Sequence, residues 1–124
     1  MSAADSAASD DSARLDLDTS GSVSRIVLAG RLDSAGVDAL EIRFNAATVA
    51  SGKAAIVDLS GVSFLASLGI RMLLTATKRM AASGRPLVLH GARGLVDEAL
   101  RSMDLYRLIP HAANEQEALD LAEA

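Results

Sequence analysis

VDLSGVSFLASLGIRMLL, residues 57–74, joins the end of an apolar segment to a polar loop and the start of an amphipathic run. The segment Ala54 to Leu59 is short, rich in β-branched residues and apolar on both faces, which is typical of a central strand covered by helices. Ser67 stands before residues with helical spacing, where a side-chain oxygen accepts hydrogen bonds from free helix amides. The stretch predicts a strand, a loop and a helix capped by Ser67.

On the N-terminal side, the pattern predicts a hairpin followed by a helix. Leu15 and Leu17 alternate with aspartates, TSGS supplies turn residues, and Val23 to Ala29 has the composition of a second, more buried strand. Asp33 or Ser34 is placed to cap the next helix after a loop from Gly30 to Asp33. The apolar residues that recur at helical spacing there are Val37, Leu40, Phe44 and Ala47.

On the C-terminal side, the pattern predicts two more strands and two more helices. Gly84 and Pro86 end the central helix, LVLH at 87–90 is a buried strand, and GARG at 91–94 is a strand-to-helix turn. RLIP at 107–110 is predicted to be a short strand, and 114–124 a final acidic helix. The predicted third helix is marked by Leu95, Ala99, Leu100 and Met103, with an ion pair between Asp97 and Arg101.

Alternation of strands and helices predicts an α/β fold. We expect a mixed, mostly parallel sheet of about five strands, with the first hairpin antiparallel, packed with about four helices. The 124 residues suit one domain, which we place at 14–124. Residues 1–13 are almost wholly Ser, Ala and Asp, so we expect a disordered acidic tail.

Composition excludes several classes of function. The chain has no cysteine, which excludes disulfides, thiolate zinc sites and a cysteine nucleophile. Without the tail, 12 basic residues face 13 acidic ones, so the basic excess of a nucleic-acid-binding protein is missing. Arg71 interrupts the longest apolar run, and no secretory signal is evident, so we expect a cytoplasmic protein that does not insert into membranes.

No catalytic set emerges from the motifs. His90 and His111 are isolated and lack metal-ligand spacing or a nucleophile partner. Neither a nucleophile elbow nor a phosphate-binding Gly-Lys-Ser/Thr loop occurs. We therefore predict no enzyme activity, no metal and no cofactor.

The stretch from residue 57 to 74 resembles the central segment of STAS domains, a family named for sulphate transporters and anti-sigma factor antagonists. LAGRLDSAG at 28–36 and EQEALDLAEA at 115–124 extend the resemblance over about residues 15–122. The family's usual motif is Asp-Ser-Ser/Thr-Gly, in which the first serine is the phosphate acceptor. Ser67 and Gly69 match it, whereas Ala66 and Leu68 depart from it.

The resemblance implies an anti-sigma factor antagonist in a partner-switching pathway. Such a protein binds an ATPase-type anti-sigma factor that is also a serine kinase, is released when its serine is phosphorylated, and is restored by a phosphatase. Ser67 is the implied phosphorylation site. The residues that we assign to partner binding are Arg31, Asp33, Leu68, Arg71, Met72 and Thr75. We also expect a weak homodimer.

A helical wheel places the partner surface on the outer side of the central helix. It predicts that Leu68, Met72, Thr75 and Arg79 face outward, where an apolar patch beside Ser67 suits a partner. The residues predicted to face the sheet are Ile70, Leu73, Leu74, Thr77 and Ala81.

Other readings of the sequence remain open. Ser67 as a helix cap alone would explain a serine there. STAS-like domains are also accessory subunits on the cytoplasmic side of membrane transporters, including lipid transporters, and a small-ligand-sensing module is a third alternative.

Overall fold

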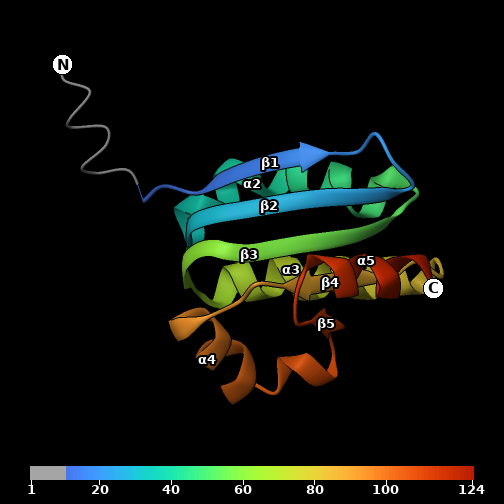
Figure 1. Ribbon diagram of the computed structural model, residues 1–124. Helices are drawn as coiled ribbons and strands as arrows, with labels where there is room; N and C mark the ends of the chain where they lie inside the picture. The colour runs from blue at the N-terminus through green and yellow to red at the C-terminus, as the bar shows by residue number, and fades with distance from the viewer. Residues whose placement is uncertain (1–10) are drawn as a thin grey trace.

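The computed structural model describes residues 11–124, and Met1 to Asp10 of the predicted tail lie outside the described residues. A five-stranded sheet with the order β1-β2-β3-β4-β5 runs through this part of the chain (Figure 1). β1 pairs with β2 in antiparallel fashion, and each later pair is parallel. The strands are β1 (Arg14–Asp18), β2 (Val23–Leu32), β3 (Ala54–Leu65), β4 (Leu87–His90) and β5 (His111–Ala112). The predicted α/β class and antiparallel hairpin are confirmed.

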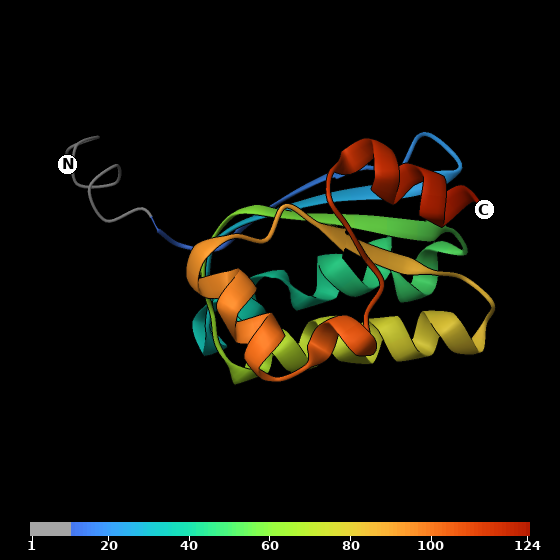
Figure 2. The same ribbon diagram turned by 60° about the horizontal axis from the view of Figure 1, so that its bottom comes forward.

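In the described part of the chain, four helices cover the sheet: α2 (Ser34–Ala47), α3 (Ser67–Ala82), α4 (Gly94–Ser102) and α5 (Glu115–Glu123). Figure 2 shows α5 on one face and α2, α3 and α4 on the other. Short 3-10 helices occupy Val49–Ser51 and Leu105–Arg107. Because parallel strands need crossover connections, α2, α3 and α4 each lie between two strands in the chain, and all three cover one face, whereas α5 follows β5 and covers the other.

The core is aliphatic and has two parts. The larger part lies between the sheet and α2, α3 and α4, and includes the buried α2 stripe that helical spacing predicted: Val37, Leu40, Phe44 and Ala47. The smaller part lies under α5 and includes Val23, Ile56, Val88, Ala118 and Ala122. Both faces of β3 are therefore buried from Ala55 to Val57, as the apolar composition of this part predicted.

Three strand predictions were wrong. β2 does not end at Ala29 but continues through most of the predicted loop at 30–33, as far as Leu32, because it pairs there with β3. β3 does not end at Leu59 but continues to Leu65, because β2 is long enough to pair with it as far as Leu32 opposite Leu65. RLIP at 107–110 is not a strand. Ile109 donates its backbone N–H to the carbonyl of Leu105 at 2.8 Å, and both residues are buried, so this segment turns helically before β5.

The third helix forms where predicted, and only part of its apolar spacing is buried. Val96 and Leu100 are buried in α4, whereas Leu95 is 69% exposed and Met103, just beyond the helix, is 55% exposed. The predicted ion pair is present, with Arg101 Nε 2.9 Å from Asp97 Oδ2. Of the residues that marked this helix in the sequence, Leu100 is buried, whereas Leu95 and Met103 are exposed.

Tyr106 connects the 3-10 helix to α4 through Asp97. Its hydroxyl donates to Asp97 Oδ1 at 2.7 Å, and this hydrogen bond, followed by that from Arg101, lowers the pKa of Asp97. Burial first and the bond to Asp97 second raise the pKa of Tyr106 to about 12.

Replacing Tyr106 by Phe should raise the pKa of Asp97 towards its ordinary value, because the leading cause of its lowering is removed. A lowered carboxyl pKa contributes stability above the unfolded pKa, and this contribution is lost as the pH falls through the folded pKa. The acid side of the stability profile should therefore be shallower in the variant. Side-chain carboxyl NMR titration measures the shift, and an unchanged Asp97 pKa would contradict this assignment.

Candidate functional site

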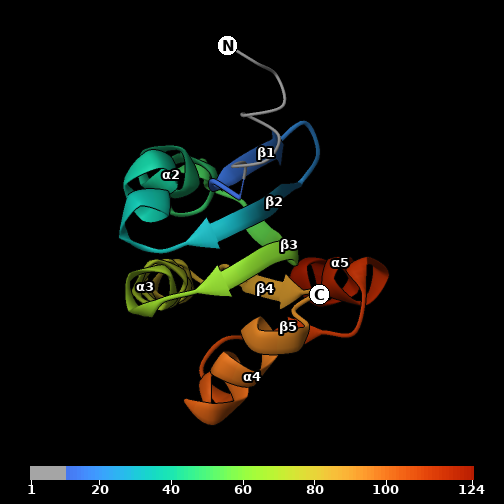
Figure 3. The same ribbon diagram turned by 90° about the vertical axis from the view of Figure 1, so that its left-hand side faces the viewer.

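The ends of β2 and β3 meet at one edge of the sheet, where α2 and α3 begin (Figure 3). Leu32 and Leu65 are register partners at the ends of the two strands. Ala66 donates its backbone N–H to the Leu32 carbonyl at 3.0 Å, which joins the two strand-to-helix connections. Asp33 and Ser67, which follow directly, therefore lie at the same edge although they are far apart in sequence.

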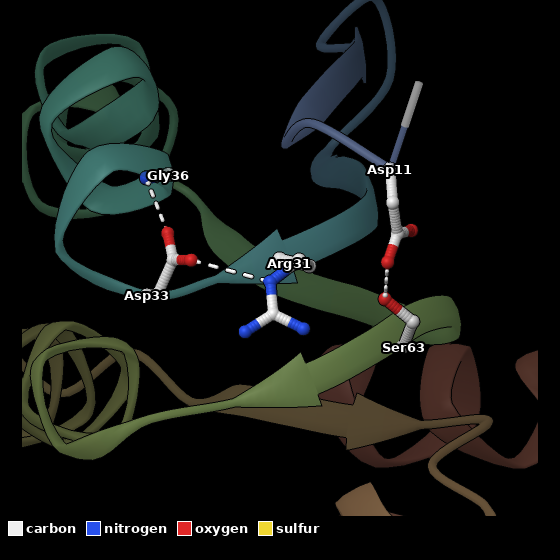
Figure 4. Close-up of polar contacts among 5 residues, drawn as sticks. All are labelled: Asp11, Arg31, Asp33, Gly36 and Ser63. Carbon is white, nitrogen blue, oxygen red and sulfur yellow. Dashed lines mark hydrogen bonds and ion pairs between the residues drawn. The ribbon is translucent and has the colours of Figure 1, made fainter. Parts of the chain in front are cut away.

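Arg31 and Asp33 form the α2 side of this edge (Figure 4). Asp33 Oδ1 accepts the Gly36 N–H at 3.0 Å, so Asp33 is the cap of α2, and this bond is the main cause that lowers the pKa of Asp33. Arg31 Nε lies 3.3 Å from Asp33 Oδ2, and its guanidinium lies 4.4 Å from the centre of the Phe64 ring. A cap, an ion pair and a cation–π contact thus position Arg31 beside the end of β3.

Three residues of the predicted tail are placed across the ends of these strands. The Asp11 carbonyl accepts the Arg31 N–H at 2.9 Å, and Asp11 Oδ2 accepts the Ser63 hydroxyl at 2.7 Å (Figure 4). A Cβ at Gly30 would lie 2.2 Å from the Ser12 carbonyl oxygen, so this close approach requires glycine. The described structure therefore includes Asp11 to Ala13, which the sequence assigned to disorder.

Ser67 is the first residue of α3 and not its cap. Ala66 is the N-cap residue, its carbonyl accepts the Ile70 N–H at 3.0 Å, and no side-chain hydrogen bond caps the helix. Ser67 is exposed, and its hydroxyl has no hydrogen-bond partner among residues 11–124. The prediction that Ser67 caps the helix was wrong because the helix begins one residue earlier than the cap assignment requires.

Gly69 allows α3 to approach the end of β2 closely. A Cβ at this position would lie 2.8 Å from the Leu32 carbonyl oxygen and 2.8 Å from Leu65 Cδ1. A larger residue would push the first turn of α3 away from the two strands. The conformation of the edge beside Ser67 thus depends on this glycine.

The Gly69→Ala substitution should destabilise the protein by about 1–3 kcal/mol, the usual cost of overpacking a filled site. Helix propensity alone would favour Ala over Gly by about 1 kcal/mol, so the two effects have opposite signs. Urea denaturation monitored by circular dichroism measures the difference in the free energy of unfolding. A stabilised variant would show that the contact with Leu32 is not tight.

The helical wheel was partly wrong about the faces of α3. Met72 is 3% exposed and belongs to the core, whereas it was predicted to face outward. Leu74 is half-buried and Ala81 is exposed, although both were predicted to face the sheet. The reason is that α3 packs against α2 as well as the sheet, so its buried arc is turned towards α2.

A groove of about 400 Å³ runs between α2 and α3 beside Ser67. It brings together Leu68, Arg71 and Thr75, three of the predicted partner-binding residues, and Met72 lines its base. Leu68 is 41% exposed, so an apolar side chain is available at its rim. Arg31 and Asp33 do not line this groove but lie at the adjoining edge.

The α2 wall of the groove was not predicted from the sequence. Asp38, Glu41 and Asn45 face Arg71 and Arg79 across it, and no ion pair joins the two walls within residues 11–124. The positions 38, 41 and 45 have helical spacing beside the buried α2 stripe, which is the signal that could have found them. That α3 lies next to this stripe is not visible in the sequence.

The two histidines do not form a metal site. Among residues 11–124 no group of three or more His, Cys, Asp or Glu side chains could hold a metal ion. His111 stacks with Tyr106 at a ring-centroid distance of 4.1 Å, and His90 is buried at the end of β4. Gly91 and Gly94 both have positive φ angles, so GARG is the predicted strand-to-helix turn.

None of the described helices is long and apolar enough to cross a membrane. In the described range the site thus consists of an exposed serine, an adjoining apolar and charged groove, and an edge held by Arg31 and Asp33. Within residues 11–124 these features lie next to one another, beside the ends of β2 and β3.

Comparison with known proteins identifies the family of this domain. The family model described as Mlab, STAS domain matches residues 3–110, and the chain belongs to the STAS domain family. No curated protein sequence matches the chain.

Solved structures of anti-sigma factor antagonists share the fold. One from Mycobacterium paratuberculosis is 24% identical with a TM-score of 0.82, covering 94% of this chain and 98% of that one. A STAS domain protein from Planctomyces limnophilus is 25% identical with a TM-score of 0.72, covering 89% and 97%. The Bacillus cell fate determinant SpoIIAA in its phosphorylated form is 21% identical with a TM-score of 0.66, covering 87% and 98%.

Proposed function

We propose that this chain is an anti-sigma factor antagonist that acts by switching partners in the cytoplasm. Its domain, which we place at 14–124, binds an ATPase-type anti-sigma factor that is also a serine kinase. Phosphorylation of Ser67 by that kinase releases the chain, and a phosphatase restores it. In this proposal the chain is a regulator without catalytic activity of its own, a cofactor or a direct contact with nucleic acid, and it forms at most a weak homodimer.

The position of Ser67 is the observation that carries the proposal. The hydroxyl is exposed on the first turn of α3 and takes no part in capping, so the fold gives no local reason for a serine at this position. Leu68 beside it is 41% exposed, and the α2–α3 groove begins at this point. A modification of Ser67 would therefore change the surface without breaking an internal contact.

The chemistry of a phosphate at Ser67 fits a switch. Phosphorylation adds about −1.5 to −2 charges, which the N-terminus of a helix accommodates because its dipole and free amides favour an anion. Arg71 lies one turn further along α3, is exposed and lines the groove, so it is placed to pair with the added phosphate. A partner that covers Leu68 would have to bury this charge, which opposes binding.

Affinity capture with the full chain tests the proposal. We expect the wild-type protein to retain an ATPase-type serine kinase from a lysate of its own cells, identified by mass spectrometry. Thr75→Lys, which adds a bulky charge in the groove, should reduce the yield. The variant Asp120→Lys on the exposed outer side of α5 is the control and should retain the partner fully.

The second candidate is the accessory subunit of a membrane lipid transporter. The alanine at position 66 supports this candidate. The acidic residue that usually precedes the acceptor serine is missing there, and the N-cap has no side-chain hydrogen bond. The matching family model is also described by the name Mlab and not by that of an antagonist. Capture of a membrane ATPase complex that is unaffected by Ser67→Asp would support this candidate over the antagonist.

A further inference from the structure

The sheet face that carries α5 is only partly covered. Figure 2 shows α5 as the helix on this side, and Figure 1 shows that it crosses the sheet near β3 and β4 and leaves β1 and the adjoining part of β2 without a helix. Val27 of β2 is 41% exposed there. A hollow of about 350 Å³ lies on this open face, which is a volume suited to a small molecule.

Strand register places polar side chains in a row across this face. Asp16 is paired with Val27, Val27 with Asp58, and Asp58 with His90. Side chains of directly paired residues lie on the same face of a sheet. The face is that of α5, because Ile56 and Val88, two residues before Asp58 and His90, pack under α5.

The carboxylates of the hollow outnumber its cations. Asp16, Asp18 and Asp58 line it, and a hydrogen bond from the Ser20 hydroxyl is the main cause that lowers the pKa of Asp18. The other acidic group, Glu115, is paired with Arg25, the one guanidinium that lines the hollow. Arg25 is also the register partner of Asp18, and its charge helps to lower the pKa of Asp18. The lining thus holds four carboxylates and one guanidinium, and Asp16 and Asp58 have no basic partner in it.

His90 supplies an independent sign of a ligand. Its side chain lines the hollow and is only 7% exposed, and its Nε2 atom has no hydrogen-bond partner among residues 11–124. Buried polar atoms in proteins are nearly always hydrogen-bonded. A neutral imidazole nitrogen without a proton accepts a hydrogen bond, which an ammonium or guanidinium group would donate.

We infer that this hollow binds a small linear dication, with one cationic group on Asp16 and Asp18 of β1 and the other on Asp58 and His90. β1 and β3 are two strand spacings apart, roughly 10 Å. Charge-assisted hydrogen bonds from the two cationic groups of the ligand would reach the carboxylates on these two strands. The exposed Val27 lies between the two ends and contacts the methylene chain of the ligand. The ligand class is therefore a diamine or a guanidino-amine. The inference is independent of the proposed role of Ser67.

Agmatine, which has a guanidinium and an ammonium group joined by a short methylene chain, is the probe for this site. Titration of the full chain, followed by ¹⁵N–¹H NMR at low salt, should give saturable shifts centred on the amides of Asp16, Val27 and Asp58. n-Butylamine, with the same chain but one charge, should bind at least about tenfold more weakly, because one end of the site stays empty.

Two variants and one control test the location. Asp16→Asn and Asp58→Asn should each weaken agmatine about tenfold. The Asn oxygen in the second variant still accepts the Ser60 N–H that Asp58 Oδ1 accepts at 2.8 Å. Asp120→Asn removes the same charge from the exposed side of α5 and should bind agmatine like the wild type.

Absence of saturable shifts up to about 10 mM agmatine would overturn the inference. Equal weakening by all three variants would also overturn it, since the effect would then follow net charge and not the site. Thermal melting of each variant, compared with the wild type, verifies that a lost signal does not come from unfolding.

Discussion

Replacing Ser67 by Asp should reduce affinity for the captured anti-sigma partner by at least about 100-fold, while the fold remains intact. The carboxylate would be buried under the partner beside Leu68. On α3, Arg71 is the basic residue nearest to this position. Stability should change little or increase by about 0.3–1 kcal/mol, because an acidic residue in the first turn of a helix is favourable. Isothermal titration calorimetry measures the affinity, and thermal melting measures the fold.

Ser83→Asp is the matched control for this substitution. Ser83 is exposed at the opposite end of the same helix, about 24 Å away, and gains the same charge. We expect it to bind the partner with wild-type affinity. If Ser67→Asp also binds with unchanged affinity, the partner does not cover this edge and the switch mechanism is wrong.

Replacing Met72 by Lys should destabilise the protein by at least about 3 kcal/mol and leave much of it unfolded at 37 °C. Met72 is 3% exposed, packs in the main core and lies at the base of the α2–α3 groove. The lost apolar contacts and the buried ammonium act in the same direction. This amount is a large fraction of the 5–15 kcal/mol that stabilises a typical domain.

Thr75→Lys is the control, because Thr75 lies on the same helix and in the same groove but is exposed. Its stability should change by no more than about 0.5 kcal/mol. Chemical denaturation of both variants gives the comparison. A stable Met72→Lys protein with impaired partner binding would indicate that Met72 faces outward, as the helical wheel predicted. That result would contradict the packing of α2 on α3.

Several features that depend on nearby residues were predicted correctly from the sequence, although the cap of α3, which is also local, was not. Asp33, one of the two cap residues predicted for α2, is the cap. The buried stripe from Val37 to Ala47 and the ion pair of Asp97 with Arg101 likewise involve residues within one or a few helical turns. The hairpin and the αL glycine that ends α3 are similarly local. In each case the pattern that indicated the feature lies within a short stretch of the chain.

Features that depend on distant neighbours were not predicted. Met72 is buried because α2 lies beside α3, and no periodicity within α3 reveals that neighbour. β3 continues beyond Leu59 because β2 is long enough to pair with it.

The candidate site also combines features set by nearby residues with features set by distant ones. Ser67 and Leu68 follow from the local motif, whereas Asp38 and Glu41 of the groove come from another helix. The row from Asp16 to His90 requires the register of four strands.

Addition of magnesium and ATP to the captured complex tests the switch most directly. If the partner is a kinase that acts on Ser67, the wild-type chain should leave the complex and carry one phosphate in its tryptic peptide Ala54–Arg71, at Ser67 and not at Ser60 or Ser63. The Ser67→Ala chain should stay bound and unmodified. A wild-type chain that remains in the complex with Ser67 unmodified would contradict the account.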